Sequence, residues 1–270
     1  KQVSSNVKVV LSGDGGDEVF GGYRKHIGEK WSALPFLIPK FIREIIINLL
    51  IENKNTSLGE VSRKIRRYLM NISREGSERQ ANWLEQINEN TIKNLLGDNL
   101  ENTKNLLEVY RSPFQDPINS MLAADLGFSL PGDMLVKTDR MSMANSLEIR
   151  SPFLDKNLVE YAFSLPGNLK IGSFKGKKIL KESFKKRLPR WSMSAPKKGF
   201  EIPIADWLKS DLKSLVEDSC SKKNLDRIGI KDPNIVDEWR ISLNSGKRDT
   251  SWQLWTLISY SKWLEAKGKL

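Results

Sequence analysis

Cysteine and histidine are nearly absent from this chain of 270 residues, which holds one of each, Cys220 and His26. A single cysteine cannot form a disulfide within the chain, and this fits a reducing compartment. A single histidine rules out a histidine-rich zinc site and argues against a serine–histidine–carboxylate triad. Any catalysis therefore falls to lysine, arginine and carboxylate side chains and to backbone amides, and we interpret His26 and Cys220 as bystanders.

Long apolar runs are lacking as well. The most apolar stretch, residues 36–51, is interrupted by Pro39, Lys40, Arg43 and Glu44, so we expect no membrane-spanning helix and no membrane partner. Residues 1–11 have no apolar segment typical of a signal peptide. Together with the cysteine content, this indicates a cytoplasmic location. The first residue is Lys1 rather than Met, and we interpret the chain as a fragment.

Charge of one sign dominates: the net charge is +11 and the pI is about 9.6. Such a balance suits polyphosphate substrates or nucleic acid. The plainer interpretation is that most lysines lie on solvated helix faces, and we favour it over a nucleic-acid partner. Hydrophobic residues at 39% and charged residues at 29% are ordinary for a globular protein.

Helical patterns fill most of the sequence. One β-branched run, residues 7–11, predicts a buried strand of a parallel sheet. Asp116 and Pro117 predict the start of a helix, Pro131 predicts another that runs towards Ser146, and Asp155 predicts an N-cap. Because one strand cannot satisfy its own edges, either short strands escape detection or the rest of the sheet precedes the chain. We therefore predict a mainly α fold with a small parallel β remnant of an α/β domain.

The sharpest chemical signal is the segment 12–23, which follows this strand. Its glycines let the backbone approach a ligand, and the carboxyl end of a parallel strand is where open α/β sheets place ligands. Asp14 and Asp17 would repel phosphate unless a cation lies between them, and Mg²⁺ is the economical choice. The alternative, a tight turn whose carboxylates satisfy local amides, stays open.

Five segments in order resemble the signatures of one family. They are residues 10–23 (VLSGDGGDEVFGGY), 135–144 (LVKTDRMSMA), 146–155 (SLEIRSPFLD), 177–181 (KKILK) and 196–203 (PKKGFEIP). They resemble the synthetase domain of glutamine-dependent (B-type) asparagine synthetases, well over residues 7–210 and weakly beyond. The resemblance implies one partial synthetase domain over residues 1–270, of the ATP-pyrophosphatase type (adenine nucleotide alpha-hydrolase-like).

The resemblance also implies a reaction and its site residues. ATP and Mg²⁺ would adenylate the side chain of aspartate with release of pyrophosphate, and glutamine-derived ammonia would then form the amide. Ser12 and Gly13 would contact the activated substrate, with Gly15 and Gly16 in the same binding loop, and Asp17 would hold the metal. Lys197 would stabilise pyrophosphate, although the adjacent Lys198 could take that role. Asp14, a candidate catalytic residue together with Lys197, stands where the family has Glu or Tyr.

Arg140 has two interpretations. With Lys137 it lies on nearly one helix face and could meet a phosphate or carboxylate. Alternatively, the pairs Asp139–Arg140 and Glu148–Arg150 are buried ion pairs that lock helices around the site, which is the interpretation we favour. Arg140 is kept as a candidate binding residue.

The chain also departs from the family. The pyrophosphatase loop, Ser-Gly-Gly-x-Asp-Ser, does not occur in it, and neither does a glutaminase domain with its amino-terminal cysteine. We therefore expect little activity from this fragment alone. Asp14 is shorter than Glu by one methylene, about 1.5 Å, which leaves the acceptor open between aspartate and another carboxylate, such as that of a surface-polysaccharide sugar.

Three classes of function stay open: the ligase, a nucleic-acid-modifying relative with the same ATP-pyrophosphatase chemistry, and a non-catalytic helical interaction module. The sequence makes no prediction of the oligomeric state.

Overall fold

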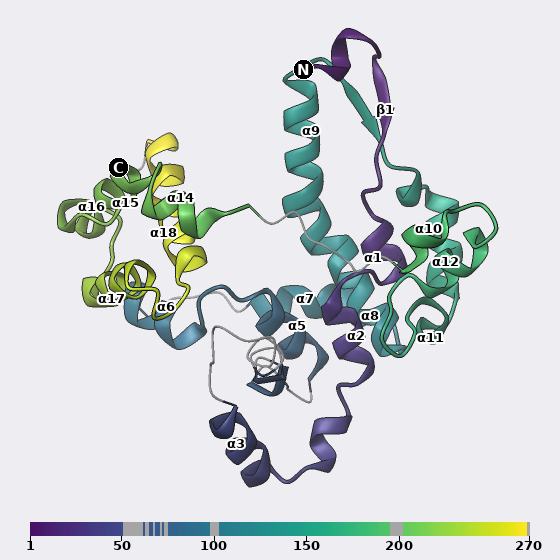
Figure 1. The fold of residues 1–270 in the computed structure, drawn as a ribbon, viewed down its shortest axis with the longest axis horizontal. Coiled ribbons are helices and arrows are strands. Elements are labelled where there is room, and N and C mark those ends of the chain that lie inside the picture. Colours follow the sequence, from purple (N-terminus) through teal and green to yellow (C-terminus); the bar gives the residue numbers. More distant parts are fainter. Residues whose placement is uncertain are drawn as a thin grey trace. The chain divides into compact units, whose positions relative to one another are not determined.

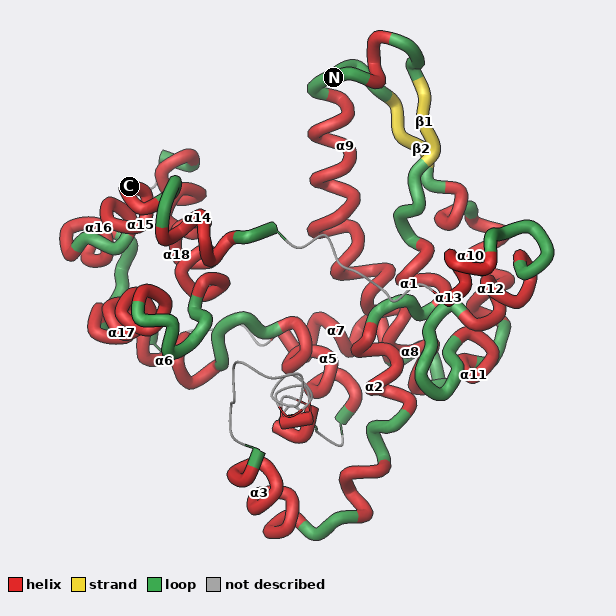
Figure 2. Tube along the Cα trace, viewed as in Figure 1, coloured by secondary structure: helices red, strands yellow, loops and turns green. Residues whose placement is uncertain are grey.

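The computed structural model describes residues 1–50, 62, 65–66, 68–70, 72, 75–97, 103–194 and 202–268. The chain divides into two compact units, residues 1–83 with 103–197 and residues 84–102 with 198–270. Both are built almost entirely from helices, and two short strands lie side by side (Figures 1 and 2). The predicted mainly α fold with a small parallel sheet is confirmed. A single synthetase domain over residues 1–270 stays a prediction.

The first unit holds the glycine-rich segment. Its elements are η1 (Val3–Ser5), β1 (Val9–Leu11), α1 (Gly16–Phe20), α2 (Arg24–Lys30), η2 (Leu34–Leu37), α3 (Lys40–Leu49), α5 (Gly76–Leu84), α7 (Thr103–Arg111), α8 (Pro117–Ala124), η3 (Asp125–Leu135), α9 (Val136–Met143), β2 (Glu148–Arg150), η4 (Pro152–Leu154), α10 (Lys156–Ser164), α11 (Gly167–Lys170), α12 (Lys178–Phe184) and α13 (Arg190–Ser194).

The two strands pair in parallel, with Val10 opposite Ile149. Strand β1 confirms the strand expected over residues 7–11, whereas β2 was not predicted, because its three residues have charged side chains at both ends. The expectation that β1 is buried is wrong in this structure: Val9 and Leu11 are 42% and 73% exposed. A sheet of two strands leaves an edge of each strand unpaired.

Helix α8 begins as predicted, because the Asp116 carboxylate accepts the backbone N–H groups of Ile118 and Asn119, each at 2.9 Å. The prediction that Pro131 opens a new helix is wrong. Pro131 lies inside η3, a π-helix that continues α8 directly into α9. Proline removes one backbone donor, and the wider π-helical turn accommodates this within a continuing helix.

Helix α1 anchors the glycine-rich segment in the core. Val19 and Phe20 are buried with Ala162 of α10, and the Phe20 ring meets Phe153 edge-on at 6.0 Å between centroids. The apolar side of α1 thus holds the glycine-rich segment against the core, while the amino-terminal end of α1 follows the loop after strand β1.

The second unit consists of α6 (Glu89–Leu96), α14 (Ile204–Lys209), α15 (Lys213–Ser219), α16 (Lys222–Arg227), α17 (Pro233–Asn244) and α18 (Ser251–Ala266). Their apolar faces enclose one core, in which Val236 and Leu254 are fully buried. Cys220 belongs to this core, and burial raises the pKa of its thiol to about 11. None of the helices in the described part of the chain is long and apolar enough to cross a membrane.

Candidate functional site

The loop between β1 and α1 begins as an extension of the sheet. The Ser12 N–H donates to the carbonyl of Arg150 at 2.8 Å, which continues the parallel ladder past the end of β1. The Ser12 hydroxyl donates to Asp14 Oδ2 at 3.0 Å and lies 2.9 Å from the Ser151 hydroxyl. Ser12 and Asp14 are therefore held together at the carboxyl end of the parallel pair.

Two glycines of this loop have opposite surroundings. Gly15 is the N-cap of α1 with φ +85°, and a Cβ there would overlap the Leu154 side chain. Gly13 is the opposite case, because no atom lies within 4 Å of where its Cβ would stand. The backbone at Gly13 thus borders open space that a ligand can enter.

Asp17, in the first turn of α1, forms an ion pair with Lys177. Lys177 Nζ lies 2.9 Å from Asp17 Oδ1, and the two side chains are 28% and 17% exposed. The Lys177 backbone has φ +55° and its N–H donates to the carbonyl of Phe20 at 3.2 Å. This places a cation beside the acidic end of the glycine-rich loop.

Lys177 was missed as a site residue. It lies in the segment 177–181, which matches the family in sequence, but nothing in the spacing assigns it a role or connects it with Asp17, 160 positions earlier. The membership of that segment in the family pattern was the one signal available.

Two further glycines allow this pair to form. A Cβ on Gly22 would overlap Asp17 Oδ1 and stand 2.6 Å from Lys177 Cε, so the pair lies directly on the Gly22 backbone. The amides of Gly21 and Gly22 both donate to the Asp17 carbonyl at 2.9 Å. The turn at 21–22 therefore supports both members of the ion pair.

Glu18, the residue after Asp17 in α1, is buried, and its carboxylate accepts a hydrogen bond from the Tyr23 hydroxyl at 2.6 Å. Burial and the neighbouring Glu18 carboxylate both raise the pKa of Tyr23, which therefore remains a protonated donor. This bond joins the first helix of the site to the residue that precedes α2.

Among the predicted site residues, the structure brings together Ser12, Gly13, Asp14 and Gly15 of the loop after β1 with Gly16 and Asp17 of the first turn of α1. Arg140 is exposed on α9, which packs against β2 and η3. Lys197 and Lys198 lie outside the described residues, so their role stays a prediction. Glu148 and Arg150 do form an ion pair at 2.8 Å, but it is exposed, and the expectation that it is buried is wrong. Residues two apart on a strand share a face, and this face lies in solvent.

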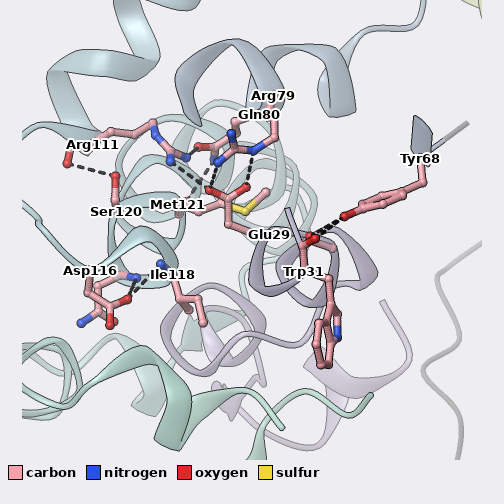
Figure 3. A network of polar contacts seen from close by, with 12 residues as sticks. Glu29, Trp31, Tyr68, Arg79, Gln80, Arg111, Asp116, Ile118, Ser120 and Met121 are labelled. Carbon is pink, nitrogen blue, oxygen red and sulfur yellow. Dashed lines mark hydrogen bonds and ion pairs between the residues drawn. The ribbon is translucent and has the colours of Figure 1, made fainter. Parts of the chain in front are cut away.

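A buried polar network joins α2 to α5 and α7 (Figure 3). The Glu29 carboxylate accepts Arg79 Nη2 at 2.6 Å and Arg111 Nη2 at 3.3 Å, and Arg111 also donates to Gln80 at 2.6 Å. Burial lowers the pKa of Arg111, and the Glu29 charge opposes this effect. Gln80 passes the network on to Asp125, to which it donates at 2.9 Å.

Asp125 is fully buried and also binds Lys25 and His26, each at 2.7 Å. Burial alone would raise the pKa of Asp125, but the hydrogen bond to His26 and the charge of Lys25 outweigh it and hold the pKa at about 2. His26, interpreted from the sequence as a bystander, is thus an enclosed member of this network.

The magnesium ion and nucleotide that the family resemblance implies fit the residues present. Asp17 offers hard carboxylate oxygens, Lys177 offers an ammonium group, and the space over Gly13 is open. In the part of the chain that is described, no group of three or more His, Cys, Asp or Glu side chains is placed to hold a metal. Magnesium at phosphate sites is commonly held by one or two carboxylates together with the substrate phosphates, and Asp17 meets that requirement.

Comparison with known proteins gives the class. The family model for asparagine synthase matches residues 1–265, so the chain belongs to the asparagine synthase family. Glutamine-hydrolyzing asparagine synthetase 1 of Bacillus subtilis is 28% identical over 97% of this chain and 41% of its own length. A Mycobacterium bovis protein provisionally named as the same enzyme is 31% identical over 97% of this chain and 40% of the relative.

A relative with a different name also matches: amidase chyE of Penicillium rubens is 27% identical over 87% of this chain and 38% of its own length. The chain therefore spans about two fifths of the length of these curated relatives. No solved structure matches it.

Proposed function

We propose that the chain is the synthetase part of an ATP-dependent, amide-forming ligase. A carboxylate is activated by ATP as an acyl adenylate, pyrophosphate leaves, and ammonia derived from glutamine replaces AMP. The observation that carries this proposal is the Asp17–Lys177 pair beside the open backbone of Gly13, at the carboxyl end of a parallel strand. A carboxylate for a metal and an ammonium for phosphate are what adenylation needs in one place.

Each residue then has a part in binding and charge compensation. Ser12 and the loop backbone at Gly13, Gly15 and Gly16 would hold the activated carboxylate, with the Gly16 N–H donating to the Gly13 carbonyl at 3.2 Å within the loop. Asp17 would hold Mg²⁺, which would neutralise phosphate charge. Lys177 would bind the same phosphates while it stays paired with Asp17, because its ammonium group has three N–H donors. Lys197 or Lys198 stabilises the departing pyrophosphate, and Arg140 remains a candidate for binding a phosphate or a carboxylate.

The proposed fold is the carboxyl-terminal portion of a single α/β domain of the ATP-pyrophosphatase type. The support lies in β1 and β2, which pair in parallel although Val9 and Leu11 are exposed. Parallel strands are usually buried on both faces of a larger sheet. We propose that further strands complete the sheet, together with a pyrophosphatase loop and a glutaminase domain in a longer polypeptide.

Aspartate is the proposed acceptor, and a different carboxylate is the alternative. Two observations favour keeping the alternative. Asp14 is engaged by the Ser12 hydroxyl at 3.0 Å within the loop, and one relative carries the name amidase rather than asparagine synthetase. Asp14, one methylene shorter than the family's Glu and bound to Ser12, would leave room for a larger acceptor.

The test is pyrophosphate release, measured with this chain and with any longer natural polypeptide that contains it. We expect release that depends on ATP, Mg²⁺ and a carboxylate, with aspartate compared against asparagine, glutamate and uronic acids. Lys213→Met, a solvated lysine of the second unit, is the matched control for Lys177→Met. Absence of release with every carboxylate, from a folded longer polypeptide, would favour the non-catalytic interaction module. RNA retained at low salt and released at high salt would instead favour the nucleic-acid-modifying relative.

A further inference from the structure

His26 is enclosed at the place where α2 meets the π-helix η3, with 1% of its surface exposed. Its Nδ1 lies 3.3 Å from the backbone nitrogen of Tyr23, and its Nε2 lies 2.7 Å from Asp125 Oδ2. A backbone N–H can only donate, so Nδ1 must accept and carries no proton. The proton of the neutral ring is therefore on Nε2 and points at Asp125.

Asp125 is in turn fixed from other helices. Besides His26 it accepts Lys25 Nζ at 2.7 Å and Gln80 Nε2 at 2.9 Å, and Gln80 is tied to the carbonyl of Met121 at 3.0 Å. Asp125 is the first residue of η3, the point at which the α-helical turns of α8 give way to wider π-helical turns, and the backbone of that continuous helix fixes its position. The carboxylate is a rigid acceptor for the imidazole.

The same network also binds α2 at a second residue, one helical turn after His26. Glu29 lies three residues after His26 and is gripped by Arg79 and Arg111 (Figure 3). Both polar side chains on this face of α2 are therefore locked by partners from α5, α7 and η3. Rotation of the His26 ring would break a buried hydrogen bond. Because the ring is enclosed, water could not replace that bond, and the rotation is therefore unfavourable.

The group that His26 restrains, the Tyr23 N–H, belongs to the turn that carries the ion pair. Tyr23 follows Gly21 and Gly22, whose amides bind the Asp17 carbonyl, and its hydroxyl binds Glu18 in α1. Asp17 Oδ1 and Lys177 Cε both lie against the Gly22 backbone. A shift of Tyr23 would thus move the surface on which Asp17 and Lys177 are placed.

We propose that His26, oriented by Asp125, is a positioning residue for the Asp17–Lys177 pair, acting through the backbone of Tyr23. It touches neither member of the pair and takes no part in proton transfer. The identity of the site as a nucleotide site rests on the proposed function, whereas the positioning of the turn does not.

The first test is spectroscopic and uses the fact that the chain has a single histidine. Labelling with ¹⁵N-histidine gives one pair of imidazole signals, from which the tautomer is read directly. We expect an unprotonated Nδ1 and a protonated Nε2 at pH 7. A ring protonated on Nδ1, or signals averaged between the two tautomers, would overturn the proposal.

The second test compares two variants that each keep one of the two hydrogen bonds. In His26→Asn the amide oxygen stands near the position of Nδ1 and can accept the Tyr23 N–H, but the bond to Asp125 is lost. In His26→Gln the amide nitrogen reaches Asp125, but the Tyr23 N–H loses its acceptor. His26→Asn loses the bond to the charged Asp125 carboxylate and His26→Gln loses a bond from a neutral backbone amide, so both melting temperatures should fall, that of His26→Asn at least as far.

We expect hydrogen exchange at Tyr23 N–H to be at least tenfold faster in His26→Gln than in His26→Asn. In a longer natural polypeptide that contains the chain, the Kd for MgATP should rise at least tenfold in His26→Gln, and His26→Asn should restore most of that loss. Equal exchange and equal affinity in the two variants would mean that His26 only stabilises the fold. If a folded longer polypeptide that contains the chain binds no nucleotide, the proposed function fails, and the tautomer and exchange rates still decide the positioning role.

Discussion

Gly176 lies directly on the backbone of Gly21, because a Cβ at residue 176 would overlap the Gly21 carbonyl oxygen and stand 3.1 Å from Gly22 Cα. Two segments more than 150 positions apart therefore meet main chain to main chain. This contact delivers Lys177 to Asp17, since Lys177 is the next residue after Gly176.

Gly176→Ala should separate these two segments. The methyl group forces the backbones apart, and overpacking of this kind costs about 1–3 kcal/mol of unfolding free energy. Because Lys177 then withdraws from Asp17, MgATP affinity should fall as well. Urea unfolding and equilibrium binding measure the two effects. Gly229→Ala is the control for strain at a glycine remote from the site, since φ is +79° there and nothing crowds its Cβ.

Substitutions of the ion pair should separate metal binding from phosphate binding. Lys177→Met removes a charged hydrogen bond to phosphate and should weaken ATP binding about tenfold to a hundredfold, with and without Mg²⁺. Asp17→Asn should weaken binding only when Mg²⁺ is present, because it removes a metal ligand and releases Lys177. Calorimetric titration with ATP, in magnesium and in EDTA, distinguishes the two. An equal loss in both conditions for Asp17→Asn would contradict a metal at this residue.

Two glycines of the loop should respond in opposite ways to alanine. Gly15→Ala places a side chain at φ +85° against Leu154, which should cost about 1–3 kcal/mol in stability. Gly13→Ala has room and should change stability by less than about 0.5 kcal/mol, yet its methyl group enters the space proposed for the ligand. We therefore expect a normal melting temperature with at least tenfold weaker binding for Gly13→Ala. Unchanged binding there would exclude this space as the ligand site.

A pH-dependent stability effect should come from Lys170. Its ammonium is fully buried, donates to Asn119 Oδ1 at 2.8 Å and lies 4.3 Å from the centre of the Phe163 ring. Burial lowers its pKa to about 8, against an ordinary value of 10.5, while the charge of Asp116 opposes the shift. The unfolded chain therefore binds more protons than the folded one between these two pH values.

Stability must then rise with pH across this window. The buried Lys170 ammonium destabilises the folded state most below pH 8. This penalty is relieved as pH rises towards 10.5, by at most roughly 3–4 kcal/mol at 1.36 kcal/mol per pKa unit. Urea unfolding of the wild type and Lys170→Met at pH 7, 8, 9 and 10 measures it. Above pH 8, the unfolding free energy of the wild type should rise steadily relative to that of Lys170→Met. A difference between the two that stays constant with pH would contradict a lowered pKa of Lys170.

The parts of the fold that depend on neighbouring residues were predictable from sequence. The Asp116 cap follows from an acceptor side chain ahead of proline, and β1 follows from consecutive β-branched residues before glycine. The loop residues from Ser12 to Asp17 form a contiguous candidate site for the same reason. Where local signals compete, prediction failed: Pro131 suggests a helix start, but the helix is already formed from α8 and passes through it.

Long-range relationships were beyond the sequence. Nothing near Lys177 indicates Asp17 as its partner, and nothing near His26 indicates Asp125, 99 positions away. Strand β2 exists because the main chain of Glu148–Arg150 meets β1, whereas its side chains suggested only an ion pair. Such pairings depend on how helices pack, which a single sequence encodes through many residues at once.

The buried Cys220 has a practical consequence. Maleimides and iodoacetamides react with thiolates, and a thiol with a pKa near 11 inside a core supplies very little thiolate at neutral pH. A fluorophore can therefore be attached at an exposed position away from the loop, such as Lys213→Cys, with the natural cysteine left in place. The label would mark one chosen position and leave the space over Gly13 open.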